Sequence, residues 1–119
     1  IVKVAIIGSR NFHDAYVRVK KCVLKHKKLY GGKLILISGG SGRVDNAAYT
    51  VAILNGIPIY TYPADWEKYG KRASFIRNKR IVRVCDIVYA FWDGRSPGTS
   101  MVIQLAKEMG KELVVRKEK

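Results

Sequence analysis

The sequence predicts an α/β protein in which a five-stranded, mostly parallel sheet lies between helices on both faces, in three layers. Short apolar runs rich in β-branched residues alternate with amphipathic helical stretches from end to end of the chain. The apolar runs are nearly continuous, which is typical of parallel strands that are buried on both faces. Gly or Ser follows several of these runs, where a strand turns into the next helix. Together, these three observations indicate repeated strand–helix–strand units.

The first half of the chain predicts three strands and two helices. Gly8 closes the first apolar run, and Gly31 and Gly56 end the two helical stretches. Both helical stretches repeat apolar positions every three or four residues, and Pro58 is tolerated near the start of the third strand. In order, the expected elements are a strand at 2–7, a helix at 14–29, a strand at 34–37, a helix at 44–55 and a strand at 57–62.

The second half of the chain continues the alternation of strands and helices, but it begins with a polar, aromatic stretch and a basic one. Residues 63–70 are polar and aromatic and are predicted to form a loop, which a basic helical stretch follows. Gly110 ends the last helix, whose apolar residues again share one face. In order, the expected elements are a loop at 63–70, a helix at 71–84, a strand at 87–92, a loop at 93–99, a helix carrying Met101 to Met109 and a strand at 113–116.

Length and composition favour one globular domain over residues 1–119. Hydrophobic residues make up 48% of the 119, which excludes disorder as the main state. No apolar run approaches the ~20 residues of a membrane helix, so no membrane partner is expected. Cys22 and Cys85 stand apart, which excludes a disulfide scaffold or a structural zinc site and suits a reducing cytoplasm. We expect both cysteines in the core, His13 and His26 at the surface, and neither a metal nor a cofactor.

The charge balance is strongly basic. Lys and Arg number 23 against 9 Asp and Glu, a formal net charge of +14. Such a chain attracts polyanions or phosphorylated ligands over long distances. The alternative is a solvated, lysine-rich surface without a dedicated partner. Charge alone therefore leaves nucleic-acid binding and simple solubility both open.

Three Gly- or Ser-containing segments follow predicted strands, and ligands of open parallel sheets bind beyond the carboxyl ends of the strands. Glycines allow a ligand to approach main-chain N–H groups, and a helix start adds the positive end of its dipole. We therefore expect the segments to converge on one anion-binding pocket; tight turns and helix caps without a ligand are the alternative. The candidate residues are Gly8, Ser9, Arg10, Ser38, Gly39, Gly40, Gly42, Asp45, Asp93, Ser96, Gly98 and Thr99.

Further candidates come from the stretch between the third and fourth strands. Trp66 and Tyr69 have rings that can stack on a base or pack as a hydrophobic lid. Arg77 and Asn78 form a polar pair in the middle of a predicted helix. Their side chains either project toward the loops or are simply solvated. No Ser-His-Asp set or metal cluster is readable, so the candidate catalytic acids are the carboxylates beside predicted ligand loops, Asp45, Asp65 and Asp93.

The order of these motifs resembles the YspA-like group of the SLOG superfamily. The resemblance rests on Ile-Gly-Ser-Arg-x-Phe at 7–12, Ser-Gly-Gly-x-x-Gly-x-Asp at 38–45, Ala-Asp-Trp-x-x-Tyr-Gly-Lys at 64–71, Arg77-Asn78, and the 90–99 loop. It covers nearly the whole chain and implies a Rossmann-like fold. Its relatives are the DNA-processing proteins and the LOG phosphoribohydrolases. The group is thought to bind nucleotides or molecules derived from them.

One departure from the LOG pattern bears on chemistry. Ser96-Pro97-Gly98-Thr99 is shorter than the LOG loop and is not followed by the glutamates of those hydrolases. Cleavage of an N-glycosidic bond needs an acid or base, which one of the three candidate aspartates would have to supply. The sequence therefore favours binding of a nucleotide-type ligand, with hydrolysis as a subsidiary activity. Single-stranded nucleic-acid binding through the basic surface is the alternative, and a homo-oligomeric scaffold is a third.

Overall fold

Five parallel strands form the sheet in the order β3-β2-β1-β4-β5. The structure is a computed structural model that describes residues 1–118. Every neighbouring pair of strands is parallel, so the predicted α/β class is confirmed and the sheet is parallel throughout. The strands are β1 Val2–Gly8, β2 Leu34–Ser38, β3 Ile59–Thr61, β4 Ile87–Trp92 and β5 Glu112–Lys117.

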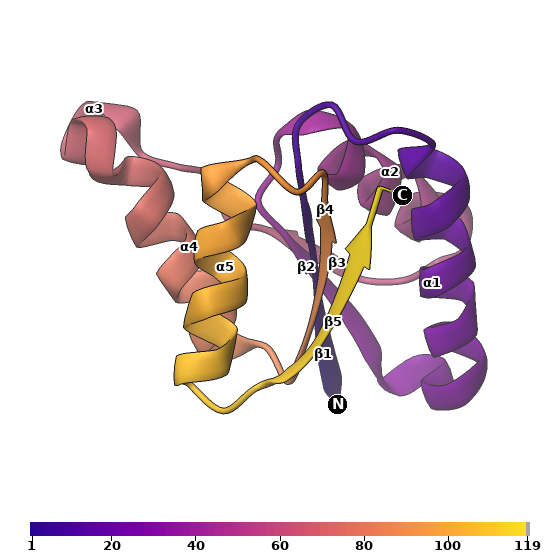
Figure 1. Cartoon of the computed structure of the whole chain (residues 1–119). Helices are drawn as coiled ribbons and strands as arrows, with labels where there is room; N and C mark the ends of the chain where they lie inside the picture. The colour runs from indigo at the N-terminus through magenta and orange to yellow at the C-terminus, as the bar shows by residue number, and fades with distance from the viewer. Residues whose placement is uncertain (119) are drawn as a thin grey trace.

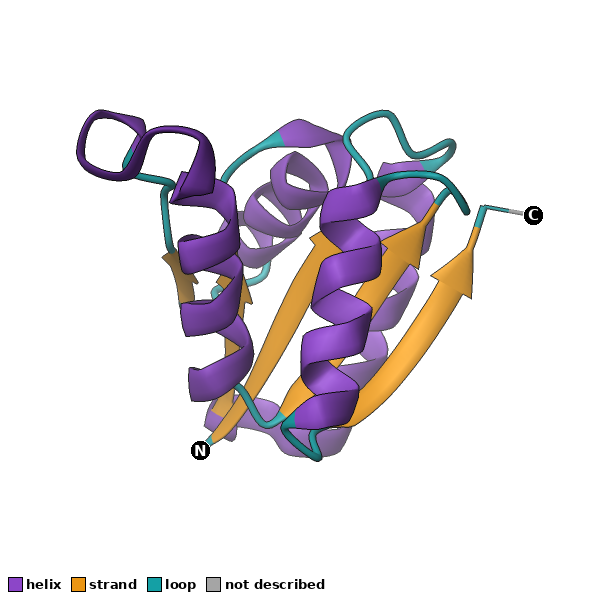
Figure 2. Cartoon of the chain, turned by 60° about the vertical axis from the view of Figure 1, so that its left-hand side comes forward, coloured by secondary structure: helices purple, strands orange, loops and turns teal. Residues whose placement is uncertain are grey.

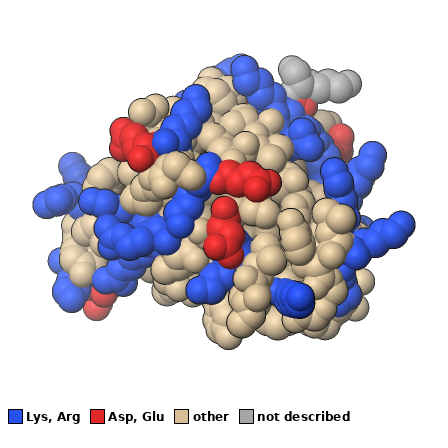
Figure 3. Space-filling model, turned by 90° about the horizontal axis from the view of Figure 1, so that it is seen from below, with Lys and Arg blue, Asp and Glu red and all other residues tan. Residues whose placement is uncertain are grey.

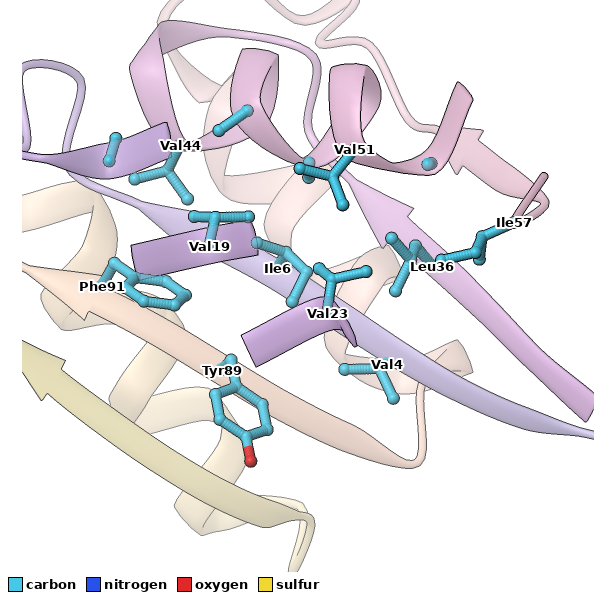
Figure 4. Packing of buried hydrophobic residues seen from close by; sticks show 14 of the residues in the cluster. Val4, Ile6, Val19, Val23, Leu36, Val44, Val51, Ile57, Tyr89 and Phe91 are labelled. Atoms are coloured by element: carbon cyan, nitrogen blue, oxygen red, sulfur yellow. The ribbon is translucent and has the colours of Figure 1, made fainter. Parts of the chain in front are cut away.

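Helices cover both faces of the sheet (Figures 1 and 2). Alternate residues of β1 point to opposite sides, with Val4 and Ile6 in one core and Ala5 and Ile7 in the other. The first core is closed by α1 and α2, and its packing is shown in Figure 4; the second is closed by α4 and α5. The helices are α1 Ala15–Tyr30, α2 Gly42–Leu54, α3 Trp66–Tyr69, α4 Ala73–Val84 and α5 Pro97–Glu108.

The strand order places a topological switch point between β1 and β4. The chain leaves β1 toward α1 and β2, whereas β4 lies on the other side of β1 and leads to α5 and β5. The loops after β1 and β4 therefore diverge, which opens a crevice at the carboxyl edge of the sheet. Ser9 donates its main-chain N–H to the carbonyl of Phe91 over 2.9 Å and ties the two loops together at this edge.

Several predicted boundaries differ from the structure. The third strand covers only Ile59–Thr61, although flanking groups keep the register, since Leu36 N donates to Pro58 O and Tyr62 N to Ser38 O. The predicted 63–70 loop contains the short helix α3, whose first turn is capped by the Asp65 carboxylate. Helix α2 begins at residue 42 rather than 44, and α5 begins at residue 97, inside the predicted 93–99 loop.

The expectation that His26 lies at the surface is wrong. Its side chain is buried, with Nδ1 2.9 Å from the carbonyl oxygen of Cys22 and the ring edge-on to Tyr89 at 4.8 Å between centroids. The ring is flat and mostly apolar, and its Nδ1 has a hydrogen-bond partner within α1, so the side chain fits the core beside Val19 and Val23. Tyr16, three residues before Val19 on the same helix, is 42% exposed, and Ala15 occupies the buried position instead.

Gly8 is required by packing. A Cβ at this position would lie 2.8 Å from Val44 Cβ and 2.9 Å from Phe91 O. We therefore expect Gly8→Ala to lower the free energy of unfolding by about 1–3 kcal/mol, because neither α2 nor the β4 main chain can move away freely. Gly98 has open space around it, so Gly98→Ala should change stability by less than about 1 kcal/mol. Urea denaturation of both variants tests these two predictions, and equal losses of stability in the two variants would contradict them.

Candidate anion-binding site at the carboxyl edge of the sheet

A cavity of about 330 Å³ lies where the β1, β2 and β4 loops meet. The three segments that the sequence predicts to converge all contribute to it, together with the first half of α4. Ser41, Ser74 and Pro97 also line it and were not among the candidates; Ser74 could have been found, because it precedes Arg77 and Asn78 at helical spacing. The predicted residues that line it are Gly8, Ser9, Arg10, Gly39, Asp45, Arg77, Asn78, Ser96, Gly98 and Thr99.

The main-chain N–H groups at the start of α2 are largely occupied by the protein itself. Gly40 N donates to Ser38 Oγ over 3.1 Å, and Ser41 N donates to Asp45 Oδ2 over 2.8 Å. Arg43 N donates to the carbonyl of Arg10 over 3.0 Å. The glycine-rich 38–45 loop is thus arranged mainly to hold its own turn, and it offers a ligand fewer amides than its composition suggests.

Two glycines of this loop accommodate close contacts with protein groups. A Cβ at Gly39 would lie 2.8 Å from Arg77 Nη1, and one at Gly42 would lie 2.9 Å from Arg10 Cα. Gly42 also has a φ of 85°, a conformation that side chains other than glycine disfavour. Because these glycines have no side chain, the β1 loop and the guanidinium of Arg77 can lie directly against the loop after β2.

The start of α5 presents open main-chain amides to the cavity. Ser96 is its N-cap and Pro97 its first residue, and the next amides, of Gly98 and Thr99, have no acceptor within the helix. The Asp93 carboxylate holds the preceding turn, since Oδ1 accepts from Arg95 N and Ser96 N at 2.8 Å and Oδ2 accepts from Ser96 Oγ at 2.9 Å. These hydrogen bonds lower the pKa of Asp93 to about 2. Asp93 therefore shapes the loop and does not line the cavity.

Asp45 is the candidate acid that lines this cavity. Its side chain is buried, and among the described residues Oδ1 has no hydrogen-bond partner although Oδ2 accepts from Ser41. Burial raises the pKa of Asp45 to about 6, against the lowering effects of the Ser41 amide, the charge of Arg77, and the nearby Gly39 amide and Ser38 hydroxyl. A buried carboxylate oxygen without a donor is costly. Because Asp45 lines the cavity, Oδ1 can accept a hydrogen bond from a hydroxyl or N–H group placed there.

Arg77 lines both this cavity and a second one. Its Nη1 donates to Gly39 O over 2.7 Å and to Tyr62 O over 3.4 Å, and its Nε donates to Asn78 Oδ1 over 2.7 Å. Partial burial lowers the pKa of Arg77, whereas Asp45 raises it. The polar pair of α4 thus points at the loops and fixes the guanidinium between the carboxyl ends of β2 and β3.

The second cavity, here called the aromatic cleft, has a volume of about 570 Å³. It lies between β3, the chain that follows it, and the start of α4. Asp65 and Tyr69 line this cleft, while Trp66 is 57% exposed and lines neither cavity. Ser38, Gly40 and Gly42, which the sequence also predicts, do not line the first cavity. The residues of the cleft are Tyr60, Thr61, Tyr62, Pro63, Ala64, Asp65, Tyr69, Ala73, Ile76, Arg77 and Arg80.

The positive charge is spread widely over the molecule. Basic side chains occupy the last turns of α1, α4 and α5, where they complement the helix dipoles at the amino edge of the sheet. Figure 3 looks onto this edge and shows Lys and Arg in several separate areas. Within residues 1–118 no three potential metal ligands come together, and no helix is both long and apolar enough to cross a bilayer.

One curated relative is clearly similar in sequence. No family model matches the chain. The Gene 61 protein of Mycobacterium phage D29 is 35% identical over 92 residues, which cover 71% of this chain and 71% of that protein. This level of identity over most of both chains indicates common descent and a shared fold.

Solved structures resemble the chain over nearly its whole length. DNA processing protein A (DprA) from Streptococcus pneumoniae has a TM-score of 0.79 at 21% identity, covering 97% of this chain and 50% of its own. DprA from Helicobacter pylori, which binds single-stranded DNA, has a TM-score of 0.76 at 19% identity and coverages of 96% and 64%. TM1055 has a TM-score of 0.73 at 18% identity and coverages of 95% and 72%. The chain spans only half to about two thirds of the DprA chains, and these likenesses show the fold.

Proposed function

Because the chain belongs to the same family as the Gene 61 protein of Mycobacterium phage D29 and has the DprA- and LOG-related fold of the SLOG superfamily, we propose that it binds a nucleotide or a nucleotide-derived phosphorylated ligand at the carboxyl edge of the sheet. The observation that carries this proposal is the pairing, in one cavity, of open α5 amides with the unpartnered oxygen of Asp45. A ligand that satisfies both must contain an anion and a hydroxyl or N–H donor.

The phosphate is assigned to the start of α5. The amides of Gly98 and Thr99 and the positive end of a twelve-residue helix favour an anion there. Arg10 is exposed at the rim of the same cavity and can add a charged, bidentate contact. Ser9 contributes to positioning, because its Oγ accepts from Asp93 N over 3.0 Å and so links the β1 and β4 loops.

The sugar and the base are assigned to the neighbouring groups. Asp45 Oδ1 is an acceptor suited to a ribose hydroxyl, and the aromatic cleft next to it offers Tyr62 and Tyr69 to a planar base. Arg77 lies between the two cavities and can reach a ligand that occupies both. Hydrolysis of an N-glycosidic bond is a subsidiary proposal in which Asp45 serves as the acid or base, and it is tested by release of free base.

Calorimetric titration with nucleoside monophosphates, ADP-ribose and the matching nucleosides tests this function. We expect the phosphorylated compounds to bind, and Arg10→Ala to weaken them by about 1.5–3 kcal/mol, or roughly 10- to 150-fold. The matched control is Arg95→Ala, since Arg95 is also exposed and lies beside the α5 loop but does not line the cavity. Absence of heat with every compound, or equal losses in both variants, would contradict the proposal.

Single-stranded nucleic acid is the second candidate ligand, favoured by the net charge of +14. Contacts to several phosphates release counterions, so its affinity would fall steeply with salt, whereas a mononucleotide depends on salt only weakly. Single-stranded DNA also differs from a ribonucleotide at the sugar, because it lacks the 2′-hydroxyl from which Asp45 can accept. Tight oligonucleotide binding that Asp45→Asn leaves unchanged, together with no binding of ribonucleotides, would favour the nucleic acid.

A further inference from the structure

A groove with a volume of about 440 Å³ lies between α1 and the strands β4 and β5. It shares no residue with the two cavities of the candidate site, so it is a separate feature of the molecule. This α1–β5 groove takes its charged and aromatic lining from Arg18, Lys21 and Lys25 of α1, Tyr89 and Phe91 of β4, and Arg116 of β5. The first helix and the last strand therefore meet here, although they are far apart in the sequence.

Every charged side chain that lines the groove is basic. Lys21, Lys25 and Arg116 are exposed, and Arg18 is half-buried. Within residues 1–118 none of the four forms an ion pair with a carboxylate. Arg18 instead donates from Nη1 to the main-chain carbonyl of Lys117 over 2.7 Å. An anionic partner would therefore meet four positive charges without displacing a carboxylate from any of them.

The carboxylates nearest to the groove in sequence do not line it. Glu112 begins β5 and faces the same side of the sheet as Arg116, but it lies outside the groove. Glu118 follows β5 and accepts from His13 N over 2.6 Å, and Asp14 Oδ2 lies 3.5 Å from His13 Nε2. Helix α1 itself contains no acidic residue. The lining of the groove thus carries positive charge only.

The sheet beside the groove is only partly covered by helix. Helix α5 packs on one face of β5, and Figure 1 shows α1 on the other side of this strand. Among the described residues of β5, only Val114 packs against the core under α1 and α2, and it stays partly exposed. Val17, which lines the groove from α1, is 65% exposed. Apolar surface therefore lies next to the four cations.

We propose that the α1–β5 groove binds an acidic, amphipathic helix of a partner protein. Residues 18, 21 and 25 share one side of α1 and are spread over about 10 Å of its length. A helix that lies alongside α1 repeats its carboxylates at the same intervals, so several can face the cations at once. Its apolar stripe would cover Val17 and the open face of β5. Charge complementarity and the uncovered apolar surface together select this occupant.

Nucleic acid fits the groove less well. Single strands bind by stacking bases on exposed aromatic faces as well as by phosphate contacts. Tyr89 and Phe91 are only 7% and 1% exposed. His26 lies edge-on to Tyr89 at 4.8 Å between centroids, and Phe12 lies edge-on to Phe91 at 5.7 Å. These rings offer no face to a base, whereas the aliphatic side chains of a helix need only apolar contact.

Fluorescence anisotropy with synthetic peptides tests the proposal. The probe is a fluorescein-labelled helical peptide of about 18 residues, with Glu on one stripe and Leu on the adjoining stripe. The comparison ligands are the same peptide with Gln in place of Glu, a scrambled peptide of the same composition, and labelled oligothymidylate of the same net charge. We expect the acidic amphipathic peptide to bind at least about tenfold more tightly than each of these three.

Lys21→Glu is the test variant and Lys20→Glu is its matched control. Both lysines are exposed on α1, and both variants change the net charge equally. Lys20 does not line the groove, and its Nζ lies 5.8 Å from the centroid of the Tyr16 ring. We expect Lys21→Glu to weaken the acidic peptide by roughly tenfold or more and Lys20→Glu by less than about twofold. Circular dichroism checks that both variants fold.

The outcome is independent of the proposed nucleotide site, because neither lysine lines its cavities. Absence of peptide binding at protein concentrations up to about 0.5 mM would overturn the proposal. Equal losses in Lys20→Glu and Lys21→Glu, or equal binding of the scrambled peptide, would also overturn it, because the net charge alone would then explain the attraction. Tighter binding of oligothymidylate that only Lys21→Glu weakens would assign the groove to nucleic acid instead. Preference for the acidic amphipathic peptide, lost in Lys21→Glu alone, supports it.

Discussion

Replacing Asp45 with Asn is expected to stabilise the protein near pH 7, by up to about 3 kcal/mol, and to weaken its ligand. The carboxylate is buried, with one oxygen unpartnered, and burial raises its pKa from 3.8 to about 6. The amide of Asn can still accept from Ser41 N but carries no charge to be desolvated. At the other oxygen position it presents a donor, so a ligand hydroxyl loses its acceptor.

The pH dependence has a definite sign. The folded state holds the Asp45 proton more tightly than the unfolded state, so the protonated carboxyl contributes stability that is fully present below about pH 3.8. This contribution is lost as pH rises to about 6, and above that the folded protein bears the full cost of the buried charge. The wild type should therefore lose stability across this window, whereas Asp45→Asn should lose much less.

Urea denaturation at a series of pH values measures both effects. Asp65→Asn is the control, because Asp65 is an exposed carboxylate at the start of α3. It should leave the pH dependence of the wild type in place. If the Asp45→Asn profile had the same slope as the wild type between about pH 4 and 6, the buried carboxylate would not be the group that titrates.

Replacing Arg77 with Met is expected to lower the free energy of unfolding by about 2–3 kcal/mol. The substitution keeps the apolar stem but removes the donors to Gly39 O, Tyr62 O and Asn78 Oδ1. It also removes the positive charge that lowers the pKa of Asp45. The loss of stability with rising pH should therefore extend above about pH 6 in this variant.

Lys79→Met is the matched control for Arg77→Met. Lys79 is exposed on the same helix, and its side chain makes no hydrogen bond within residues 1–118. Its replacement should change stability by less than about 0.5 kcal/mol, as is usual for surface positions. Equal losses in the two variants would show that the guanidinium does not hold the loops together.

The sequence predicted which loops meet at the site, but it did not predict which of their main-chain amides are free. Alternation of strands and helices places the ends of β1, β2 and β4 at one edge, and the three loops do line one cavity. Whether a loop amide is free depends on contacts from other parts of the chain. Arg43 N is occupied by Arg10 O, a partner that no local pattern reveals. The open amides therefore lie at the start of α5 rather than in the glycine-rich 38–45 loop.

His26 illustrates a conflict between pattern and residue type. Its spacing from Val19 and Val23 places it on the buried stripe of α1, while its polar ring favours the surface. His26 is buried because two groups surround its ring. Tyr89 of β4 packs edge-on against it, and the carbonyl oxygen of Cys22, one helical turn earlier, lies close to Nδ1. At His26 the periodicity was the better guide, because an imidazole ring needs few polar partners.

Because one side chain lines both cavities, a ligand bound in one cavity can affect the other. Arg77 lines both cavities, and its guanidinium donates to the carbonyl oxygens of Gly39 and Tyr62. An anion that draws this group toward one cavity would weaken those hydrogen bonds and change the lining of the other cavity. Occupancy of either compartment then alters the shape of its neighbour, so the affinities of two molecules bound side by side would be linked in both directions.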